Sequence, residues 1–401
     1  MSFIAFGFGI VLSVIEVGYV DIKAYYFDDS KLYNEFYVDP IPATYKFPEK
    51  KRNLIYIFLE SLESSYTSKE FGGIKEDNLI PNLTNLALDK GVNFSNGEYL
   101  GRMLPIPGGS HTASAMVAQT AGNTSLHVNN YGKDGEEFLP GANSIGEILQ
   151  KEGYNQVLFF GSDAAFAGRD KYFSQHGDYE IRDYKWAKEN ELIPEDYKVW
   201  WGYEDKKLFD FAKETLTELS SQEQPFNFTF LTADTHFEDG YLDANAPKVF
   251  DDQYSNVINY SDSQIMSFVE WIEAQPFYEN TSVILVGDHL TMDKDFMKDV
   301  PETYQRTIYN LFFNSGQESG VRTNRLFSSL DMLPTTLATL GVEIPNNRLG
   351  LGVNLFSNDE TLIESIGYDS FYAELMKRST FYERNFMQGT DLKQILKNQT
   401  K

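Results

Sequence analysis

Short apolar runs alternate with amphipathic stretches along most of the chain. Runs rich in β-branched and aromatic residues, which are typical of buried strands, occupy 53–59, 156–160, 226–231, 282–286 and 309–313. Residues 92–100 are predicted to be extended, and the helical pattern covers 81–88, 112–117, 143–151, 205–219, 254–273 and 330–340. This alternation predicts an α/β fold with three layers, α/β/α, around a mostly parallel central sheet.

The stretch from Phe3 to Val20 is apolar apart from Ser13 and Glu16. It approaches the roughly 20 residues that span a bilayer, although Glu16 is costly in lipid. We interpret it as the end of a transmembrane segment or a membrane-adjacent helix, with a buried core helix and a signal peptide as alternatives. The predicted organisation is a membrane-proximal segment and connector at 1–51, a main α/β domain at 52–345 and a small C-terminal lobe at 346–401.

The charge balance excludes one class of partner. The 401 residues carry 59 acidic and 34 basic side chains, for a net charge of −25. Nucleic-acid binding depends on basic surfaces, so it is not expected here, and broad docking on an anionic bilayer is disfavoured as well. The chain has no cysteine, which excludes disulfides, zinc–thiolate sites and a cysteine nucleophile.

Two of the predicted strands end at residues that can bind a metal ion. Glu60 closes the first run, and Asp288-His289 follow the run at 282–286 after a single glycine. Ligands of open α/β sheets bind beyond the carboxyl ends of the strands, and parallel strands bring those ends to one edge. Carboxylate oxygens and an imidazole nitrogen suit a divalent metal. The alternative is a solvated polar turn at each strand end.

A glycine-rich loop, Gly108-Gly-Ser-His-Thr112, leads into the helix predicted at 112–117. Free amide groups and the positive end of the helix dipole favour a phosphate there, and they stabilise a hydroxyl that loses its proton. A Ser or Thr N-cap is the alternative reading of the same hydroxyl residues.

Over about residues 50–355 the chain resembles the phosphoglycerol transferases of the alkaline phosphatase/sulfatase superfamily, a group that includes lipoteichoic acid synthase. The resemblance rests on these motifs taken together. Order and spacing carry the resemblance. Its pieces are Leu59-Glu60-Ser-Leu-Glu, the Thr112 loop with Met116-Val-Ala-Gln, Phe138-Leu-Pro-Gly-Ala142, Phe160-Gly-Ser-Asp, Phe166-Ala-Gly-Arg169-Asp, Trp201-Gly-Tyr-Glu-Asp-Lys-Lys-Leu-Phe209, Leu231-Thr-Ala-Asp-Thr-His236 and Gly287-Asp288-His289-Leu.

By that resemblance, four residues bind one divalent metal, manganese or alternatively magnesium: Glu60, Thr112, Asp288 and His289. Thr112 is then also the nucleophile. The resemblance further implies that Arg169 and His236 bind the phosphoglycerol group. His236 can also protonate the leaving alkoxide, with Asp234 as a residue that orients it, and His111 is a further candidate for substrate contact.

The hypothesis is an extracytoplasmic, membrane-associated enzyme that transfers glycerol phosphate from phosphatidylglycerol to a glycan or cell-wall polysaccharide. A phosphodiesterase or phosphatase of the same superfamily and a non-catalytic glycan-binding module are the alternatives. Sulfate-ester hydrolysis is disfavoured, because cysteine is absent and the Thr112 loop lacks the Pro and Arg of the sulfatase maturation motif.

Overall fold

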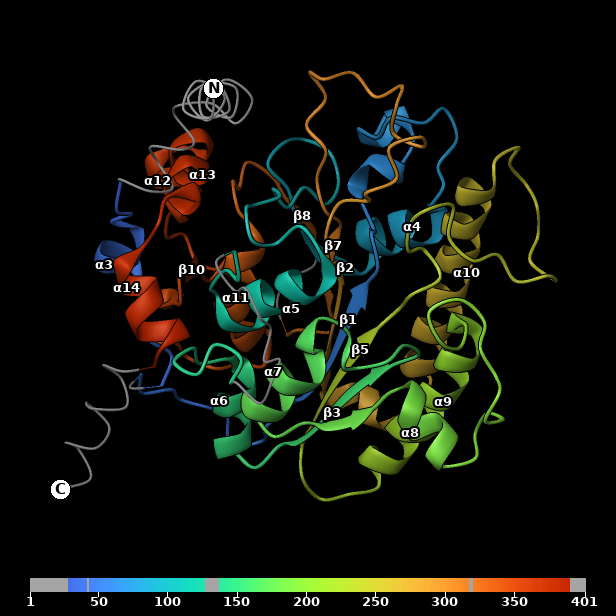
Figure 1. Ribbon diagram of the computed structural model, residues 1–401, viewed down its shortest axis with the longest axis horizontal. Helices are drawn as coiled ribbons and strands as arrows, with labels where there is room; N and C mark the ends of the chain where they lie inside the picture. The colour runs from blue at the N-terminus through green and yellow to red at the C-terminus, as the bar shows by residue number, and fades with distance from the viewer. Residues whose placement is uncertain (1–27, 42, 127–136, 317–319, 390–401) are drawn as a thin grey trace, which may run out of the picture.

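An eight-stranded β-sheet forms the centre of the molecule, with helices on both of its faces (Figure 1). The computed structural model describes residues 28–41, 43–126, 137–316 and 320–389. The predicted membrane segment at 3–20 lies outside these residues. Among the residues that are described, no helix is long and apolar enough to cross a membrane.

The strands of this sheet follow the order β4-β3-β5-β1-β6-β7-β2-β8. Their bounds are β1 Asn53–Leu59, β2 Gly91–Phe94, β3 Asn155–Phe160, β4 Glu180–Arg182, β5 Phe226–Leu231, β6 Thr281–Gly287, β7 Asn310–Phe313 and β8 Gly320–Arg322. Within the sheet β7 is antiparallel to both of its neighbours, β6 and β2, and every other pairing is parallel. The predicted α/β fold with a mostly parallel sheet is therefore confirmed.

Strand β1 shows how the sheet separates two hydrophobic cores. Side chains of successive strand residues point to opposite faces. Tyr56 and Phe58 accordingly belong to one buried core, and Ile55 and Ile57 belong to the other. Because both faces are covered, β1 is apolar and aromatic from Leu54 to Leu59 rather than alternating with polar residues.

Helices cover each face, as Figure 1 shows. The core that contains Phe58 is covered by α5 Thr112–Ala121, α6 Ile145–Lys151, α7 Arg169–Gln175 and α11 Met332–Thr339. The core that contains Ile57 is covered by α4 Pro81–Asp89, α8 Tyr184–Glu189, α9 Asp205–Ser220 and α10 Gln253–Glu273.

Segments from the two ends of the described chain pack together on the α5 side. The elements are α3 Leu32–Phe36, the small sheet of β9 Arg348–Leu349 and β10 Gly352–Val353, and α12 Leu362–Ile366, α13 Tyr368–Met376 and α14 Thr380–Tyr382. Tyr33 of α3 stacks on Phe381 of α14 with ring centroids 6.4 Å apart. Both helices contribute to the same core as α5, and the proposed domain boundaries at 51 and 345 stay a prediction.

Two strands of the central sheet were not predicted from the sequence, and one segment was predicted too long. β4 and β8 have three residues each, too few to display an alternation of apolar and polar positions. The extended segment predicted at 92–100 is a strand only as far as Phe94. Beyond it the Gly97 N–H donates to the Ser95 hydroxyl over 3.2 Å, so a turn replaces the strand.

Candidate functional site

β1 and β6 lie side by side in the sheet and end at the same level. Their register pairs Leu59 with Gly287, so Glu60 and Asp288 are the first residues beyond the paired ends. The Asp288 N–H donates to the Leu59 carbonyl over 3.2 Å, which extends the ladder by one bond. Two residues far apart in the sequence thereby share one edge of the sheet.

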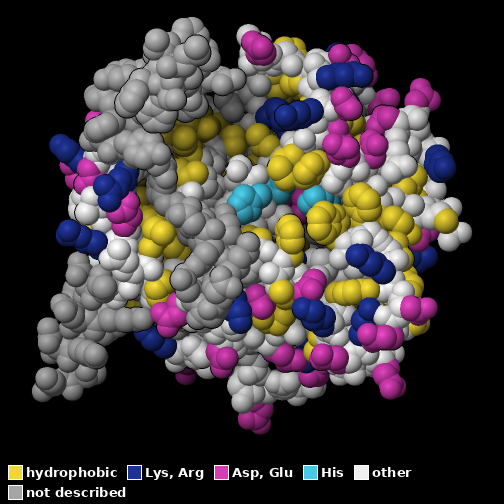
Figure 2. Space-filling model, viewed as in Figure 1, with side chains coloured by type: hydrophobic (Ala, Val, Ile, Leu, Met, Phe, Trp, Pro, Cys, Tyr) yellow, Lys and Arg dark blue, Asp and Glu magenta, His cyan; other side chains and the backbone are white. Residues whose placement is uncertain are grey.

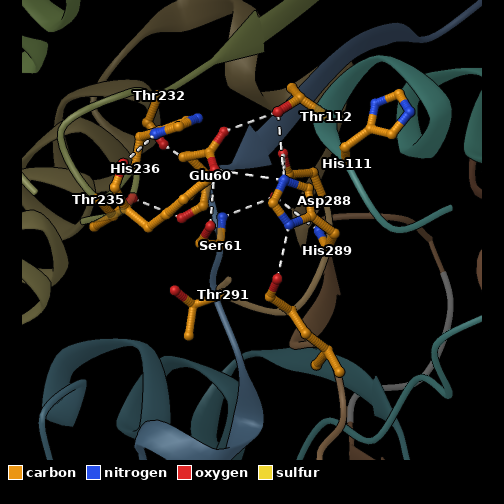
Figure 3. A network of polar contacts seen from close by, with 12 residues as sticks. Glu60, Ser61, His111, Thr112, Thr232, Thr235, His236, Asp288, His289 and Thr291 are labelled. Carbon is orange, nitrogen blue, oxygen red and sulfur yellow. Dashed lines mark hydrogen bonds and ion pairs between the residues drawn. The ribbon is translucent and has the colours of Figure 1, made fainter. Parts of the chain in front are cut away.

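Glu60, Asp288 and His289 form a buried cluster at this edge (Figure 3). One candidate ligand atom from each lies within 4.8 Å of the other two. His289 Nε2 is 3.5 Å from Glu60 Oε1 and 3.4 Å from Asp288 Oδ2. The three side chains are at most 3% exposed.

The His289 ring is held so that one nitrogen faces the two carboxylates. Its Nδ1 lies 2.8 Å from the Leu290 carbonyl, and only a protonated Nδ1 can donate to that oxygen. In the neutral ring Nε2 then keeps its lone pair and points at the cluster. This arrangement, with one nitrogen fixed by a carbonyl and the other available, is typical of histidine that binds a metal.

Thr112 is the first residue of α5, and its hydroxyl faces the cluster. Oγ1 donates to Glu60 Oε2 over 3.1 Å and lies 3.4 Å from His289 Nε2. The N-cap of the helix is His111: its Nδ1 accepts the Ser114 N–H, and its own N–H donates to the Ser114 hydroxyl. The alternative that Thr112 is the helix cap is therefore wrong, and its hydroxyl is available for other chemistry.

Burial and mutual charge set the ionisation of the cluster. Burial and the Glu60 charge raise the pKa of Asp288 to about 7. Burial also opposes ionisation of Glu60, yet the charges of His289 and His236 and the hydrogen bonds from Ser61 and Thr112 together lower the pKa of Glu60. Burial likewise works against protonation of His289, but the two carboxylates outweigh it and raise the pKa of its ring.

The donor set fits a divalent cation. Asp288 Oδ2 is fully buried and has no hydrogen-bond partner among the described residues. An uncompensated buried carboxylate oxygen is costly, and a cation bound there would remove that cost. Two carboxylates, one imidazole and one hydroxyl also form the mixed oxygen and nitrogen set that manganese and magnesium accept.

Arg169 lies at the start of α7 and is buried beside the cluster. Its Nη2 donates to the Ser162 hydroxyl over 3.1 Å and to the Asp163 carbonyl over 2.7 Å. The guanidinium carbon lies 4.5 Å from the centroid of the Phe160 ring. Burial lowers the pKa of Arg169 to about 10, so the side chain is still charged at neutral pH. The structure thus places a fixed cation in the site rather than in a surface ion pair.

His236 follows β5 and is held by its own loop. Its Nδ1 lies 2.6 Å from the Phe237 carbonyl, and its ring lies 4.6 Å from the Trp201 ring and 4.9 Å from the Phe237 ring. Trp201 and Phe237 therefore flank the histidine, a contact that no motif in the sequence predicts.

Asp234 does not orient His236 in this structure. Its Oδ2 accepts the N–H of Asp205 at the start of α9 over 3.1 Å, and its Oδ1 has no hydrogen-bond partner among the described residues. The Asp205 carboxylate in turn accepts the N–H groups of Ala233 and Asp234. Asp234 therefore fixes the loop after β5 to α9, and the Phe237 carbonyl fixes the His236 ring.

A cavity of about 610 Å³ opens over these residues. Its polar lining includes Glu60, His111, Thr112, Arg169 and His236. Its apolar lining includes Phe166, Trp201, Leu231, Phe237 and Met292. Figure 2 shows histidines and hydrophobic side chains together near the middle of this face. The lining of the cavity thus combines polar and apolar side chains.

Two curated relatives carry the name phosphoglycerol transferase I. The protein of Xanthomonas campestris pv. campestris is 28% identical over 411 residues, which cover 98% of this chain and 56% of the relative. The protein of Escherichia coli is 29% identical over 374 residues, which cover 86% of this chain and 46% of the relative. The chain thus spans about half the length of the curated relatives it matches.

Solved structures share the fold. The lipoteichoic acid synthase LtaP from Listeria monocytogenes superimposes with a TM-score of 0.62 at 19% identity, over 78% of each chain. A protein of the alkaline phosphatase superfamily from Vibrio parahaemolyticus gives 0.61 at 20% identity, over 80% of this chain and 77% of the other. At these identities the likeness establishes the architecture alone.

The family comparison covers the whole site. The family model described as Sulfatase matches residues 52–342. That span runs from the start of β1 to just beyond α11 and includes the Glu60–Asp288–His289 cluster, Thr112, Arg169 and His236. The match covers well over half of the chain. The chain therefore belongs to the sulfatase family.

Proposed function

We propose that the chain is a phosphoglycerol transferase that moves glycerol phosphate through a covalent intermediate on Thr112. One observation carries the proposal: the Thr112 hydroxyl contacts the buried Glu60–Asp288–His289 cluster beside a cavity that is also lined by Arg169 and His236. The names of the Xanthomonas and Escherichia relatives support this reaction over other chemistry of the family.

Glu60, Asp288, His289 and Thr112 are the residues that would hold a divalent metal, with manganese as the first candidate and magnesium as the second. Such an ion would lower the pKa of the Thr112 hydroxyl and neutralise charge on the phosphoryl group. The two carboxylates keep the centre close to neutral once a dication is bound. The Nδ1 contact with the Leu290 carbonyl keeps the imidazole in the tautomer that presents Nε2.

In the first step Thr112 Oγ1 attacks the phosphorus of a phosphoglycerol lipid. The hydroxyl already donates to Glu60 Oε2, so its proton has an acceptor as the new P–O bond forms. The bond between phosphorus and diacylglycerol breaks. The diacylglycerol oxygen takes a proton from His236 Nε2, and glycerophospho-Thr112 remains. In the second step an acceptor hydroxyl gives its proton to His236, and its oxygen displaces Thr112 from phosphorus. The Thr112 oxygen takes back the proton from Glu60, and the glycerophosphoryl group remains on the acceptor.

Arg169 and His236 bind the phosphate in this scheme. Nε and Nη2 of Arg169 already donate to protein acceptors, which fixes the plane of the guanidinium beside the cluster. A fixed, charged guanidinium suits phosphate oxygens, and no reorganisation is needed when charge develops on them. His111 lines the same cavity next to Thr112, and we assign it a contact with the glycerol part of the substrate.

Phosphatidylglycerol is the proposed donor and a glycan or cell-wall polysaccharide the proposed acceptor. A lipid donor and an envelope acceptor place the catalytic domain outside the cytoplasm and close to a membrane. The strongly acidic net charge fits local contact with lipid through the cavity rather than broad adhesion to an anionic surface.

Mass spectrometry of the intact protein tests the proposal. The protein is incubated with manganese and phosphatidylglycerol carrying an isotope-labelled head group, without acceptor. We expect an adduct of one glycerophosphoryl group that maps to Thr112. Thr112→Ala should form no adduct and should lose transfer by about 10³-fold or more, because the nucleophile is absent.

Ser110→Ala serves as the matched control, because Ser110 is an exposed hydroxyl residue two positions before Thr112. It should keep the adduct and the activity. Adding glycan separates transfer from hydrolysis: labelled glycerophosphate on the glycan supports a transferase, and its release to water with and without glycan supports a phosphodiesterase. Full transfer by Thr112→Ala would exclude the covalent mechanism.

A further inference from the structure

Ser61 lies between the two carboxylates of the metal-binding cluster and contacts both. We infer that Ser61 is a positioning residue that fixes Glu60 and Asp288 in the arrangement that binds the ion. The inference rests on the metal centre of the proposed function, but not on the identity of the lipid or the acceptor. No family motif or resemblance assigned a role to this serine, and the geometry alone points to it.

The two contacts come from different parts of the residue. The Ser61 hydroxyl donates to Glu60 Oε1 over 2.8 Å. The Ser61 backbone N–H donates to Asp288 Oδ1 over 2.8 Å. One fully buried residue thus satisfies a carboxylate from the end of β1 and another from the end of β6. Figure 3 shows Ser61 beside both side chains.

These bonds decide which carboxylate oxygens stay available. Asp288 Oδ1 accepts from the N–H groups of Ser61 and His289, both at 2.8 Å, while Oδ2 is left without a hydrogen bond. Glu60 Oε2 is left to the Thr112 hydroxyl because Ser61 occupies Oε1. Removal of such outer partners typically weakens metal binding by about 10- to 100-fold.

The backbone of Ser61 is in the left-handed region, with φ at 53°. A residue with a Cβ atom is strained in this conformation, and glycine is not. The turn aims the N–H at Asp288, and the Tyr66 hydroxyl secures it by donating to the Ser61 carbonyl over 3.0 Å. Glycine would give the same turn without strain, so the hydroxyl is the property that serine alone adds.

Ser64 provides a matched comparison in the same loop. It is also buried, at 4% exposure, but its hydroxyl has no hydrogen-bond partner among the described residues. Two buried serines three positions apart thus differ in whether the hydroxyl reaches a metal-binding carboxylate. Replacing each by alanine removes the same atom from the same segment.

Calorimetric titration of the full chain with manganese chloride tests the inference. We expect Ser61→Ala and Ser61→Gly to raise the Kd for manganese by about 10- to 100-fold, by similar factors, because both lose the hydroxyl and keep the N–H. Ser64→Ala should stay within about twofold of the wild type. The manganese concentration for half-maximal transfer should move by the same factor as the Kd.

Thermal unfolding after chelation shows whether each variant folds, and Ser61→Gly provides a variant without backbone strain. If both Ser61 variants bind manganese like the wild type, or lower only the metal-free Tm, Ser61 is merely structural and the inference is wrong. If the wild type itself does not bind manganese, the metal centre and this inference both fail. Manganese binding without glycerophosphate transfer would refute the transferase alone and leave the role of Ser61 intact.

Discussion

Two buried histidines of this protein use their rings in opposite ways. His289 is 1% exposed and His176, at the C-terminal end of α7, is 4% exposed. His176 places both nitrogens close to acceptors: Nδ1 lies 2.7 Å from Glu147 Oε1, and Nε2 lies 2.8 Å from the Phe138 carbonyl. His289 has one such contact, and its Nε2 has only contacts of 3.4 to 3.5 Å.

The difference distinguishes a structural histidine from the histidine that is proposed to bind the metal. Both nitrogens of His176 face an acceptor, so a ring that donates to both has no lone pair left for a metal. The long contacts of His289 leave room for an ion among three oxygens. Burial and a nearby carboxylate are common to both residues, so neither property alone identifies the functional one.

The largest expected effect concerns metal binding and transfer. His289→Ala removes a ligand, so we expect manganese binding to weaken, and transfer to fall, by more than about 100-fold, beyond the cost of losing an outer partner. His176→Ala should keep the wild-type Kd, because its ring faces α6 and not the cavity. Calorimetry and transfer assays on both variants measure the contrast. If both variants lose manganese affinity and transfer activity to the same extent, the proposed difference between the two histidines is wrong.

The next effect concerns stability. His176→Ala leaves the Glu147 carboxylate and the Phe138 carbonyl without their shared donor, and we expect the free energy of unfolding to fall by ~3 kcal/mol. Denaturant titration of metal-free protein measures it. His176→Gln, which keeps one donor, should lose less. A change below about 0.5 kcal/mol for His176→Ala would show that this contact adds little to the fold.

Manganese itself should distinguish the two residues again. At a free concentration of 100 times its Kd, the ion should raise the free energy of unfolding by about 2.7 kcal/mol. We expect this gain in the wild type and in His176→Ala, and at most about 0.4 kcal/mol at the same concentration in His289→Ala. Chemical unfolding with manganese and with chelator gives the values. The same gain in all three proteins would place the metal somewhere other than the cluster.

The smallest effect is a pH dependence. Burial opposes protonation of His176, but the Glu147 carboxylate outweighs it and raises the pKa of the ring above its ordinary 6.5. A raised folded-state pKa contributes stability that is fully present below about 6.5 and is lost as the pH rises through the folded value. The difference in unfolding free energy between the metal-free wild type and His176→Gln should therefore shrink with rising pH. A constant difference would mean that His176 does not titrate in this window.

The sequence anticipates the parts of the structure that depend on local pattern. The apolar run ending at Glu60 and the one before Asp288 predict strands, and the general behaviour of parallel sheets brings their ends together. The role of Ser61 could not be predicted, because its N–H meets a carboxylate 227 positions away in the sequence. The sequence predicts that Asp234 contacts and orients His236. In the structure the Asp234 carboxylate instead accepts a hydrogen bond from the backbone N–H at the start of α9.

Tertiary packing also decides strand direction. The run at 310–313 has the same apolar composition as the runs that form the parallel strands, yet β7 is antiparallel to β6 and β2. Apolar content reports burial and says nothing about direction. The contact between His176 and Glu147 could not be predicted either. Glu147 lies on another helix, and only tertiary packing brings the two side chains together.

The position of β1 in the sheet has a consequence for folding. Its first residue, Asn53, bonds to Phe226 and to Thr281, which lie 173 and 228 residues further along the chain. During synthesis both edges of this apolar strand therefore stay unpaired until most of the domain has been made, and such edges favour aggregation. Contacts of this sequence separation also form slowly. The Glu60–Asp288–His289 cluster forms only when β6 joins β1. If this cluster is the manganese site as proposed, manganese binding during refolding should report completion of the fold.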